Sequence, residues 1–377
     1  MSKVRRYDID WIRVLVFDVL IIYHVGMFFV PWGWHIKNDI EVEWMRYPMV
    51  FVNQWRLPIL FVVSGMGTCY AMSFRTGKVY IKERFKRLFI PLLTGILIMI
   101  PPQVYIERLV YGDTDLSFFN WFPEFFKGIY PTGNFSWHHL WFLPYLLLMS
   151  LLATPLFLKW RRPENVFISK IRKTLNKSPF YLYLFTIPFF FIEAFLEPIF
   201  PVNHALVGDW YALTAYGLLF LCGFVLIAVG ETFWENVNKI KVVALFIGVI
   251  SFPSLFWFWI NKDPSVFIPI LKVVNVWSWM LVIFGYSAKY LNKESRIIKY
   301  RNKAVYPFYI LHQTITIIIG FYLMSMPIHY GLKFVVMLVG TFGFSWLIYE
   351  FIIRRWQILW PLFGLKKPSK QNNKQKY

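Results

Sequence analysis

Long apolar stretches alternate with short polar connections along almost the entire chain. Each stretch holds roughly 20 mainly apolar residues, the length that an α-helix needs to cross a bilayer. We therefore predict an all-α fold, a polytopic membrane helical bundle of about ten transmembrane helices. The predicted spans are 12–31, 48–73, 88–106, 138–158, 180–200, 210–230, 241–260, 266–288, 304–325 and 332–353.

The spans show no internal repeat, so the simplest prediction is a single domain over residues 1–363. Residues 364–377 are polar, basic and low in complexity, and we expect them to form a disordered cytoplasmic tail. The first apolar run lacks a small-residue cleavage site and is too long for the core of a signal peptide. We therefore expect it to be a retained membrane anchor.

Composition supports the prediction of a membrane protein. Hydrophobic residues make up 58% of the 377 residues and charged residues only 16%, whereas soluble domains hold about 25% charged residues. Both cysteines, Cys69 and Cys222, lie within apolar runs. The sequence therefore offers no disulfide framework and no cysteine metal site.

The basic residues indicate an orientation. Segments rich in lysine and arginine fall at every second connection, whereas the alternate connections are poorer in them and rich in Trp, Phe and Pro. Because positively charged loops stay in the cytoplasm, we expect both termini there, with the protein integral to the plasma membrane. The net charge of +20 then reflects topology and not nucleic-acid binding, and a basic face suits anionic lipid headgroups or an anionic cofactor.

Ionisable residues inside the first span carry the strongest functional signal, because a charge in hydrocarbon is costly unless it faces the bundle interior and finds a partner. Arg13 and His24 are 11 positions apart, which puts them within about 20° of one helix face and about 16 Å apart along the axis. Asp10 lies on the same stripe, within pairing reach of Arg13. The alternative is that Arg13 reaches lipid phosphates and His24 bonds a neighbouring helix.

Five segments of the chain occur in the order of one family's motifs. They are "DIDWIRVLVFDVLIIYH", "LFVVSGMGT", "RFKRLFIP", "HLWFLPYLLL" and "YPFYILHQTI". Because all five occur in the family's order, the chain resembles the integral-membrane acyltransferase 3 family. The wording of "RRYDIDWIRV", "YHVGMFFVPWGWH" and "HHLWFLPYL" further resembles the branch that includes acyl and succinyl transferases acting on bacterial periplasmic glucans.

The resemblance implies an O-acyltransferase that moves an acyl group, acetyl or succinyl, from cytoplasmic acyl-CoA to a hydroxyl of a carbohydrate or glycan at the outer face. Acyl-CoA is then a co-substrate, and we expect no permanently bound cofactor and no metal. Arg84 and Arg87, three residues apart, match the family's Arg-x-x-Arg motif and are expected to bind the CoA phosphates. The alternative for both is ordinary flanking charge, which is what we expect of Lys82 and Lys86.

We predict that His24 is the general base that takes the proton of the acceptor hydroxyl. Arg13 is predicted to bind the donor or stabilise developing charge, with Asp10 holding its orientation.

Four further residues are candidates for substrate binding, each with a structural alternative. His139 is otherwise an interfacial residue, His312 a hydrogen-bonding residue between helices, and Trp141 a packing residue. Ser64 could act as a nucleophile, or Ser64 and Gly65 could form a turn or a close contact between helices. We expect no serine acyl-enzyme. An outer loop with Glu193, Glu197, His204 and Asp209 suits sugar hydroxyls, or is simply wetted.

Two functions from other classes remain open. A membrane glycosyltransferase would use a metal-binding Asp-x-Asp, for which the chain offers "DID" at 8–10 and "DTD" at 113–115, on opposite sides of the predicted membrane. A transporter or flippase of a glycan or lipid precursor would show inverted repeats, which the sequence lacks.

Overall fold

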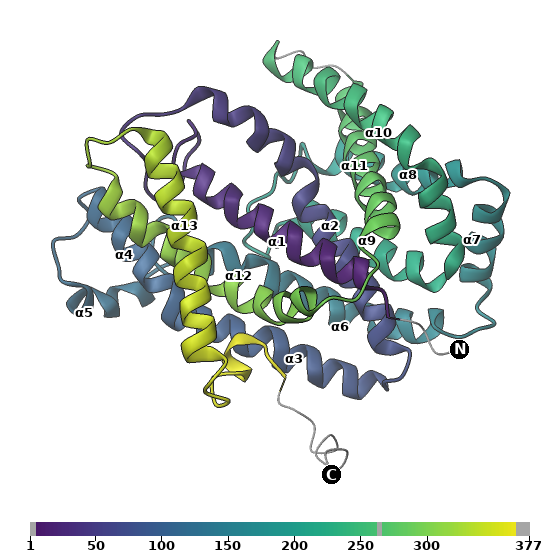
Figure 1. Ribbon diagram of the computed structural model, residues 1–377, viewed down its shortest axis with the longest axis horizontal. Coiled ribbons are helices and arrows are strands. Elements are labelled where there is room, and N and C mark those ends of the chain that lie inside the picture. The colour runs from purple at the N-terminus through teal and green to yellow at the C-terminus, as the bar shows by residue number, and fades with distance from the viewer. Residues whose placement is uncertain (1–4, 262–265, 367–377) are drawn as a thin grey trace. The chain divides into compact units, whose positions relative to one another are not determined.

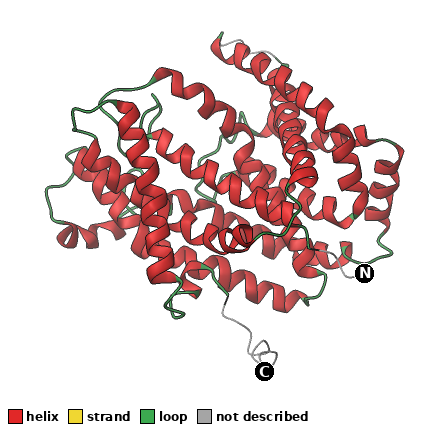
Figure 2. Cartoon of the chain, in the orientation of Figure 1, coloured by secondary structure: helices red, strands yellow, loops and turns green. Residues whose placement is uncertain are grey.

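The computed structural model describes residues 5–261 and 266–366, and residues 367–377 of the predicted tail lie outside the described residues. No strand forms in these ranges, where Figure 2 shows helices joined by loops, so the predicted all-α fold is confirmed. The α-helices are α1 (Tyr7–Met27), α2 (Arg46–Met72), α3 (Gly77–Thr94), α4 (Ile100–Val110), α5 (Phe118–Trp121), α6 (Phe142–Trp160), α7 (Val166–Lys177), α8 (Thr186–Phe191), α9 (Trp210–Ala228), α10 (Glu231–Ile260), α11 (Ile268–Tyr290), α12 (Arg296–Leu323) and α13 (Tyr330–Ile348).

Shorter helical segments extend or precede several of these helices. Three are π-helical, namely η2 (Gly95–Met99), η6 (Ile192–Leu196) and η7 (Tyr349–Ile353). The 3₁₀ segments are η1 (Glu43–Met45), η3 (Phe122–Phe126), η4 (His138–Trp141), η5 (Pro179–Phe185) and η8 (Pro361–Phe363). The π-helical η2 joins α3 to α4 in one long helical segment.

Nine helical segments within the described residues are long and apolar enough to cross a membrane. They are Glu43–Met72, Gly77–Val110, His138–Trp160, Pro179–Leu196, Trp210–Ala228, Glu231–Ile260, Ile268–Tyr290, Arg296–Leu323 and Tyr330–Ile353. Each overlaps one of the nine spans predicted from 48–73 onward. The first predicted span corresponds to α1, whose 21 residues include Asp8, Asp10, Arg13 and Asp18, too many charges to qualify on composition alone.

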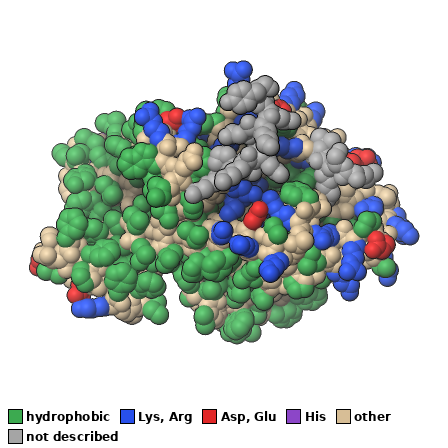
Figure 3. Space-filling view, turned by 90° about the horizontal axis from the view of Figure 1, so that it is seen from below, with side chains coloured by type: hydrophobic (Ala, Val, Ile, Leu, Met, Phe, Trp, Pro, Cys, Tyr) green, Lys and Arg blue, Asp and Glu red, His purple; other side chains and the backbone are tan. Residues whose placement is uncertain are grey.

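The protein is therefore a multi-pass membrane protein. Figure 3 shows hydrophobic side chains over much of the face that it presents. Among the exposed large side chains are Phe246 and Ile250 on α10 and Val339 on α13. Lipid is the natural neighbour of such surfaces, because water would make their exposure costly.

The chain divides into two compact units, which are described separately. Unit 1 comprises Met1–Val19, Tyr47–Ile81 and Leu148–Asn302, and unit 2 comprises Leu20–Arg46, Lys82–Leu147 and Lys303–Tyr377. The boundaries in sequence fall inside α1, α2, α3, α6 and α12.

Close helix packing organises unit 1. Helices α10 and α11 lie side by side (Figure 1). Helices α2 and α9 approach so closely that a Cβ on Gly65 would lie 2.0 Å from the backbone oxygen of Phe220, and a Cβ on Gly223 would lie 1.9 Å from that of Val62. Only glycine fits at either position, which is the way that membrane helices bring their backbones together.

In unit 2, a buried lysine ties the loop after α1 to the start of α13. Lys333 is 1% exposed and donates hydrogen bonds to Asn38 Oδ1 at 2.8 Å, Asp39 Oδ1 at 3.0 Å and the Met324 carbonyl at 3.0 Å. These three acceptors compensate for the cost of burying the ammonium. The contact lowers the pKa of the Asp39 carboxyl, with the Lys333 hydrogen bond as the main cause.

Candidate active site

Two histidines from distant parts of the chain meet in unit 2. His24, near the end of α1, lies with its Nδ1 2.7 Å from Nε2 of His312, in the middle of α12. The two ring planes are nearly parallel, 11° apart. His312 is fully buried, whereas His24 is half-buried.

The hydrogen bonds around His312 assign the protons of this pair. His312 Nδ1 lies 2.7 Å from the backbone oxygen of Tyr309, which can only accept, so Nδ1 carries the proton and donates. In a neutral His312, Nε2 then holds the lone pair, and His24 Nδ1–H donates to it. Nε2 of His24 is left with a lone pair, which is the arrangement that a general base requires.

His139 joins the same group. It lies in η4, 6% exposed, with its ring at right angles to that of His312 and the ring centroids 5.0 Å apart. His139 Nε2 is 3.3 Å from the Ile310 carbonyl oxygen. The Tyr309 hydroxyl donates a hydrogen bond to the backbone oxygen of His139 at 2.6 Å. Three of the predicted site residues, the buried His139 and His312 and the half-buried His24, therefore form one group, which we call the histidine cluster.

A second polar group in unit 2 was not predicted. Glu107, on α4, accepts a hydrogen bond from the Tyr130 hydroxyl at 3.0 Å and lies 2.5 Å from Nδ1 of His35. His35 Nε2 is in turn 3.1 Å from the side-chain nitrogen of Gln313. Burial and the Glu107 carboxylate raise the pKa of Tyr130 well above its usual value, so its hydroxyl stays protonated. We call Glu107, His35, Tyr130, His138 and Gln313 the Glu107 cluster.

The sequence contained a weak signal for this cluster. Glu107 is an acidic residue at the border of the predicted span 88–106, and Gln313 is the neighbour of the candidate His312. His138 packs on His35 with ring centroids 4.3 Å apart. What the sequence lacks is any sign that residues about 70 positions apart meet.

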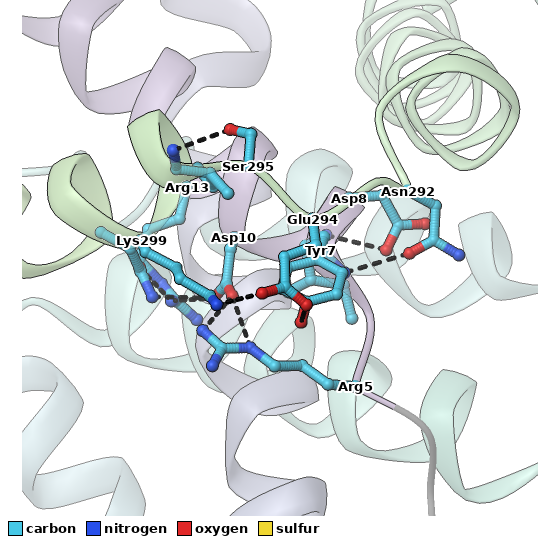
Figure 4. A network of polar contacts seen from close by, with 12 residues as sticks. Arg5, Tyr7, Asp8, Asp10, Arg13, Asn292, Glu294, Ser295 and Lys299 are labelled. Carbon is cyan, nitrogen blue, oxygen red and sulfur yellow. Dashed lines mark hydrogen bonds and ion pairs between the residues drawn. The ribbon is translucent and has the colours of Figure 1, made fainter.

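Unit 1 contains the predicted pair of Asp10 and Arg13. Arg13 Nη1 donates to Asp10 Oδ1 at 3.2 Å and to Asn302 Oδ1 at 3.0 Å, and the Asn302 amide donates back to Asp10 Oδ1 at 3.0 Å. Figure 4 shows Arg5 directed at the same carboxylate, to which its Nη2 donates at 2.8 Å. This hydrogen bond raises the pKa of Arg5. Asp10 thus pairs with Arg13, the contact that their spacing predicts, and Asn302 is an unpredicted third member of the group.

Arg84 and Arg87 lie in unit 2. Both are part of α3, since that helix begins 11 residues before the predicted span 88–106. Arg84 is half-buried and Arg87 exposed. The Tyr306 hydroxyl donates to the Arg87 backbone oxygen at 2.9 Å, which fixes the helix at this point.

The remaining predicted site residues have mainly structural contacts. Ser64 lies within α2 and not in a turn, and its hydroxyl donates to the Leu60 carbonyl of its own helix at 2.7 Å. Trp141 is 8% exposed and packs edge-on against Tyr145. Near the end of the chain, Glu350 and Arg354 form an ion pair.

The outer-loop residues make contacts within unit 1. Glu193 pairs with Lys272 and accepts from the Tyr211 hydroxyl at 2.6 Å. Asp209 Oδ2 accepts from the backbone N–H of His204 at 2.9 Å. Burial lowers the pKa of His204 to about 4, although the Asp209 carboxylate opposes this, so its ring is neutral at pH 7.

The Asp-x-Asp triplets hold ion pairs with arginines. Asp8 pairs with Arg6 at 2.6 Å, and Asp113 with Arg108 at 3.1 Å. Within residues 5–261 and 266–366, no group of three or more His, Cys, Asp or Glu side chains is placed to hold a metal ion.

Fold and site thus define a polytopic helical membrane protein with a largely buried histidine cluster. A family model described as an acyltransferase domain, that of the acyltransferase 3 family, matches residues 6–350. The match covers nearly the whole chain, so the chain belongs to this family and is an enzyme, an O-acyltransferase. The predicted resemblance is confirmed.

Full-length relatives agree with this assignment. Glucans biosynthesis protein C of Salmonella schwarzengrund is 22% identical over an alignment that covers 98% of this chain and 97% of that protein. The proteins of the same name from Salmonella typhi and Salmonella paratyphi B are also 22% identical, with the same coverage. No solved structure shows significant similarity to the chain.

Proposed function

We propose that this enzyme transfers an acetyl or succinyl group from cytoplasmic acyl-CoA to a hydroxyl of a glycan at the outer face of the plasma membrane, with both termini in the cytoplasm. The acceptor class is supported by the relatives, whose name is glucans biosynthesis protein C. The donor side is supported by the family motif around Arg84 and Arg87, whose guanidinium groups suit CoA phosphates.

The observation that carries the proposal is the contact between His24 and His312. It leaves the lone pair on His24 Nε2, which takes the proton of the acceptor hydroxyl while that oxygen attacks the thioester carbonyl carbon. The new C–O bond forms, the C–S bond breaks, and the leaving CoA thiolate takes the proton back from His24. The products are the acylated glycan and CoA, with no net change in the enzyme.

His312 supports this step in two ways. It holds the His24 ring in one tautomer, and its Nε2 accepts a charge-assisted hydrogen bond when His24 becomes an imidazolium. Arg13 is held by Asp10 and Asn302. Its assigned role is to bind the acyl-CoA donor or to stabilise the charge that develops during transfer. Its planar guanidinium presents donors in a fixed geometry that suits an anionic group, which a lysine would not offer.

Donor binding tests the proposal without knowledge of the acceptor. Purified protein is titrated with acetyl-CoA, succinyl-CoA and free CoA, alongside the double variant Arg84→Ala/Arg87→Ala. The matched control is Lys82→Ala/Lys86→Ala, which removes the same charge from the same exposed part of α3. We expect saturable binding by wild type and by the control, and its loss in the arginine variant. Absence of binding by folded wild type, in detergent and in nanodiscs, would contradict the proposal and favour a transporter or a glycosyltransferase.

A further inference from the structure

The Glu107 cluster adjoins the histidine cluster through two pairs of consecutive residues. On η4, His139 packs on His312, while His138 packs on His35. On α12, His312 contacts His24, while Gln313 contacts His35. Because consecutive Cα atoms are about 3.8 Å apart, the two clusters are immediate neighbours within unit 2.

Two ring nitrogens at this junction are buried without a hydrogen-bond partner among residues 5–261 and 266–366, namely His138 Nε2 and His139 Nδ1. His139 is 94% buried, since its exposure is 6%. Because its Nε2–H donates to the Ile310 carbonyl, its Nδ1 presents a lone pair. A buried acceptor of this kind is costly to leave unsatisfied, so it calls for a donor from a ligand, such as a hydroxyl.

The chemistry of the Glu107 cluster selects among ligands. The Glu107 carboxylate has about four lone-pair sites, of which His35 and Tyr130 use two, so it can accept further hydrogen bonds. The side chains of Glu107 and His35 are 9% and 11% exposed, so the site is largely sheltered from solvent. A carboxylate here would repel the phosphates of CoA, whereas it suits neutral hydroxyl groups.

Aromatic rings surround these polar groups. The Trp34 ring lies 5.6 Å from that of His35, and the Tyr130 ring lies 4.9 Å from that of His138. Arg108 fixes the Tyr130 loop by donating to the carbonyls of Pro131 and Gly133, each at 2.8 Å. Polar groups with rigid aromatic surfaces match a sugar ring, which has hydroxyls at its edge and C–H groups on its faces.

We propose that the Glu107 cluster binds the carbohydrate acceptor, with Glu107 accepting hydrogen bonds from sugar hydroxyls beside the histidine cluster. This inference rests on the proposed function and adds the acceptor subsite to it. The loops that carry His35 and Tyr130 belong to the connections that the sequence predicts at the outer face, where such an acceptor is expected.

The test is binding of a short linear glucan oligosaccharide to full-length protein in nanodiscs, with acyl-CoA binding measured on the same samples. Glu107→Gln keeps the shape of the side chain but removes its charge, and we expect about tenfold or greater weakening of glucan binding with unchanged acyl-CoA binding. Tyr130→Phe removes one hydroxyl and should weaken glucan binding severalfold. The control Glu124→Gln removes a carboxylate that pairs with Lys127 at 2.7 Å, and it should leave both affinities unchanged.

The outcomes separate this inference from the proposed function. Wild type that binds acyl-CoA but not the glucan, or a folded Glu107→Gln variant that binds the glucan as wild type does, would overturn the acceptor subsite alone. Absence of acyl-CoA binding by folded wild type would overturn the proposed function. If Glu107→Gln does not fold, the same comparison with Tyr130→Phe decides.

Discussion

Replacing His312 by phenylalanine separates its chemical role from its packing role. Phenylalanine retains an aromatic ring of similar size in the buried site, but it has no nitrogen to accept the proton on His24 Nδ1. His24 then lacks the partner that selects its tautomer. The variant is therefore expected to fold and to bind acyl-CoA as wild type does, while transferring acyl groups more slowly.

The contact geometry sets the size of the loss. The distance of 2.7 Å between the two nitrogens indicates a strong hydrogen bond, which becomes charge-assisted once His24 is protonated. Such bonds are worth about 1.5–3 kcal/mol. Since each 1.36 kcal/mol corresponds to about a tenfold change in rate, kcat should fall by about 10- to 150-fold.

Steady-state transfer of a radiolabelled acyl group from acyl-CoA measures this effect, and a double-mutant cycle assigns it. In a His24→Ala background, His312→Phe should change kcat by less than about twofold, because His312 acts through His24. Wild-type kcat in folded His312→Phe would refute the reasoning. A further loss of about tenfold in the double variant would do the same, since it would give His312 a role independent of His24.

Two other changes test other parts of the account. Arg13→Lys should lower kcat/KM for acyl-CoA about tenfold or more with an unchanged melting temperature. The control Arg5→Lys should have little effect, because Arg5 pairs with the same carboxylate but is 56% exposed. Equal effects of the two variants in transfer kinetics would argue against a special role for Arg13. His204 has a pKa of about 4 in the folded protein and about 6.5 in the unfolded chain. Its contribution to the free energy of unfolding is therefore complete above about pH 6.5 and is lost as the pH falls towards 4. The loss amounts to up to about 3 kcal/mol. The melting temperature of wild type should therefore fall more steeply over this range than that of His204→Asn, which tolerates the φ of 58° at this position; identical pH profiles would contradict the assignment.

Local pattern predicted the elements of the fold well. Runs of apolar residues located every long helix, because a bilayer requires continuous apolar helices of fixed length. Helix ends were less predictable: α3 begins 11 residues before its predicted span and α12 eight residues before, because basic residues extend membrane helices into the interface. The π-helical segments η2, η6 and η7 have no signal in the hydrophobic period.

Contacts within one helix could be read from spacing, as the pair of Asp10 and Arg13 shows. Contacts between helices could not. His24 and His312 were each candidates as polar residues inside apolar spans, but their meeting depends on how α1 and α12 pack, which no single-helix pattern encodes. Asn302 and Glu107 were missed for the same reason, since they contact Arg13 and His35, which lie far away in sequence.

Acyl transfer by His24 variants tests the central claim most directly. Wild type, His24→Ala and His24→Gln are compared for transfer of a labelled acyl group from acyl-CoA to the glucan oligosaccharide, with acyl-CoA affinity and melting temperature measured on the same preparations. The account predicts a loss of transfer of about 10²- to 10⁴-fold, the usual worth of a general base, with donor affinity and melting temperature unchanged. Full transfer activity in folded His24→Gln would contradict it.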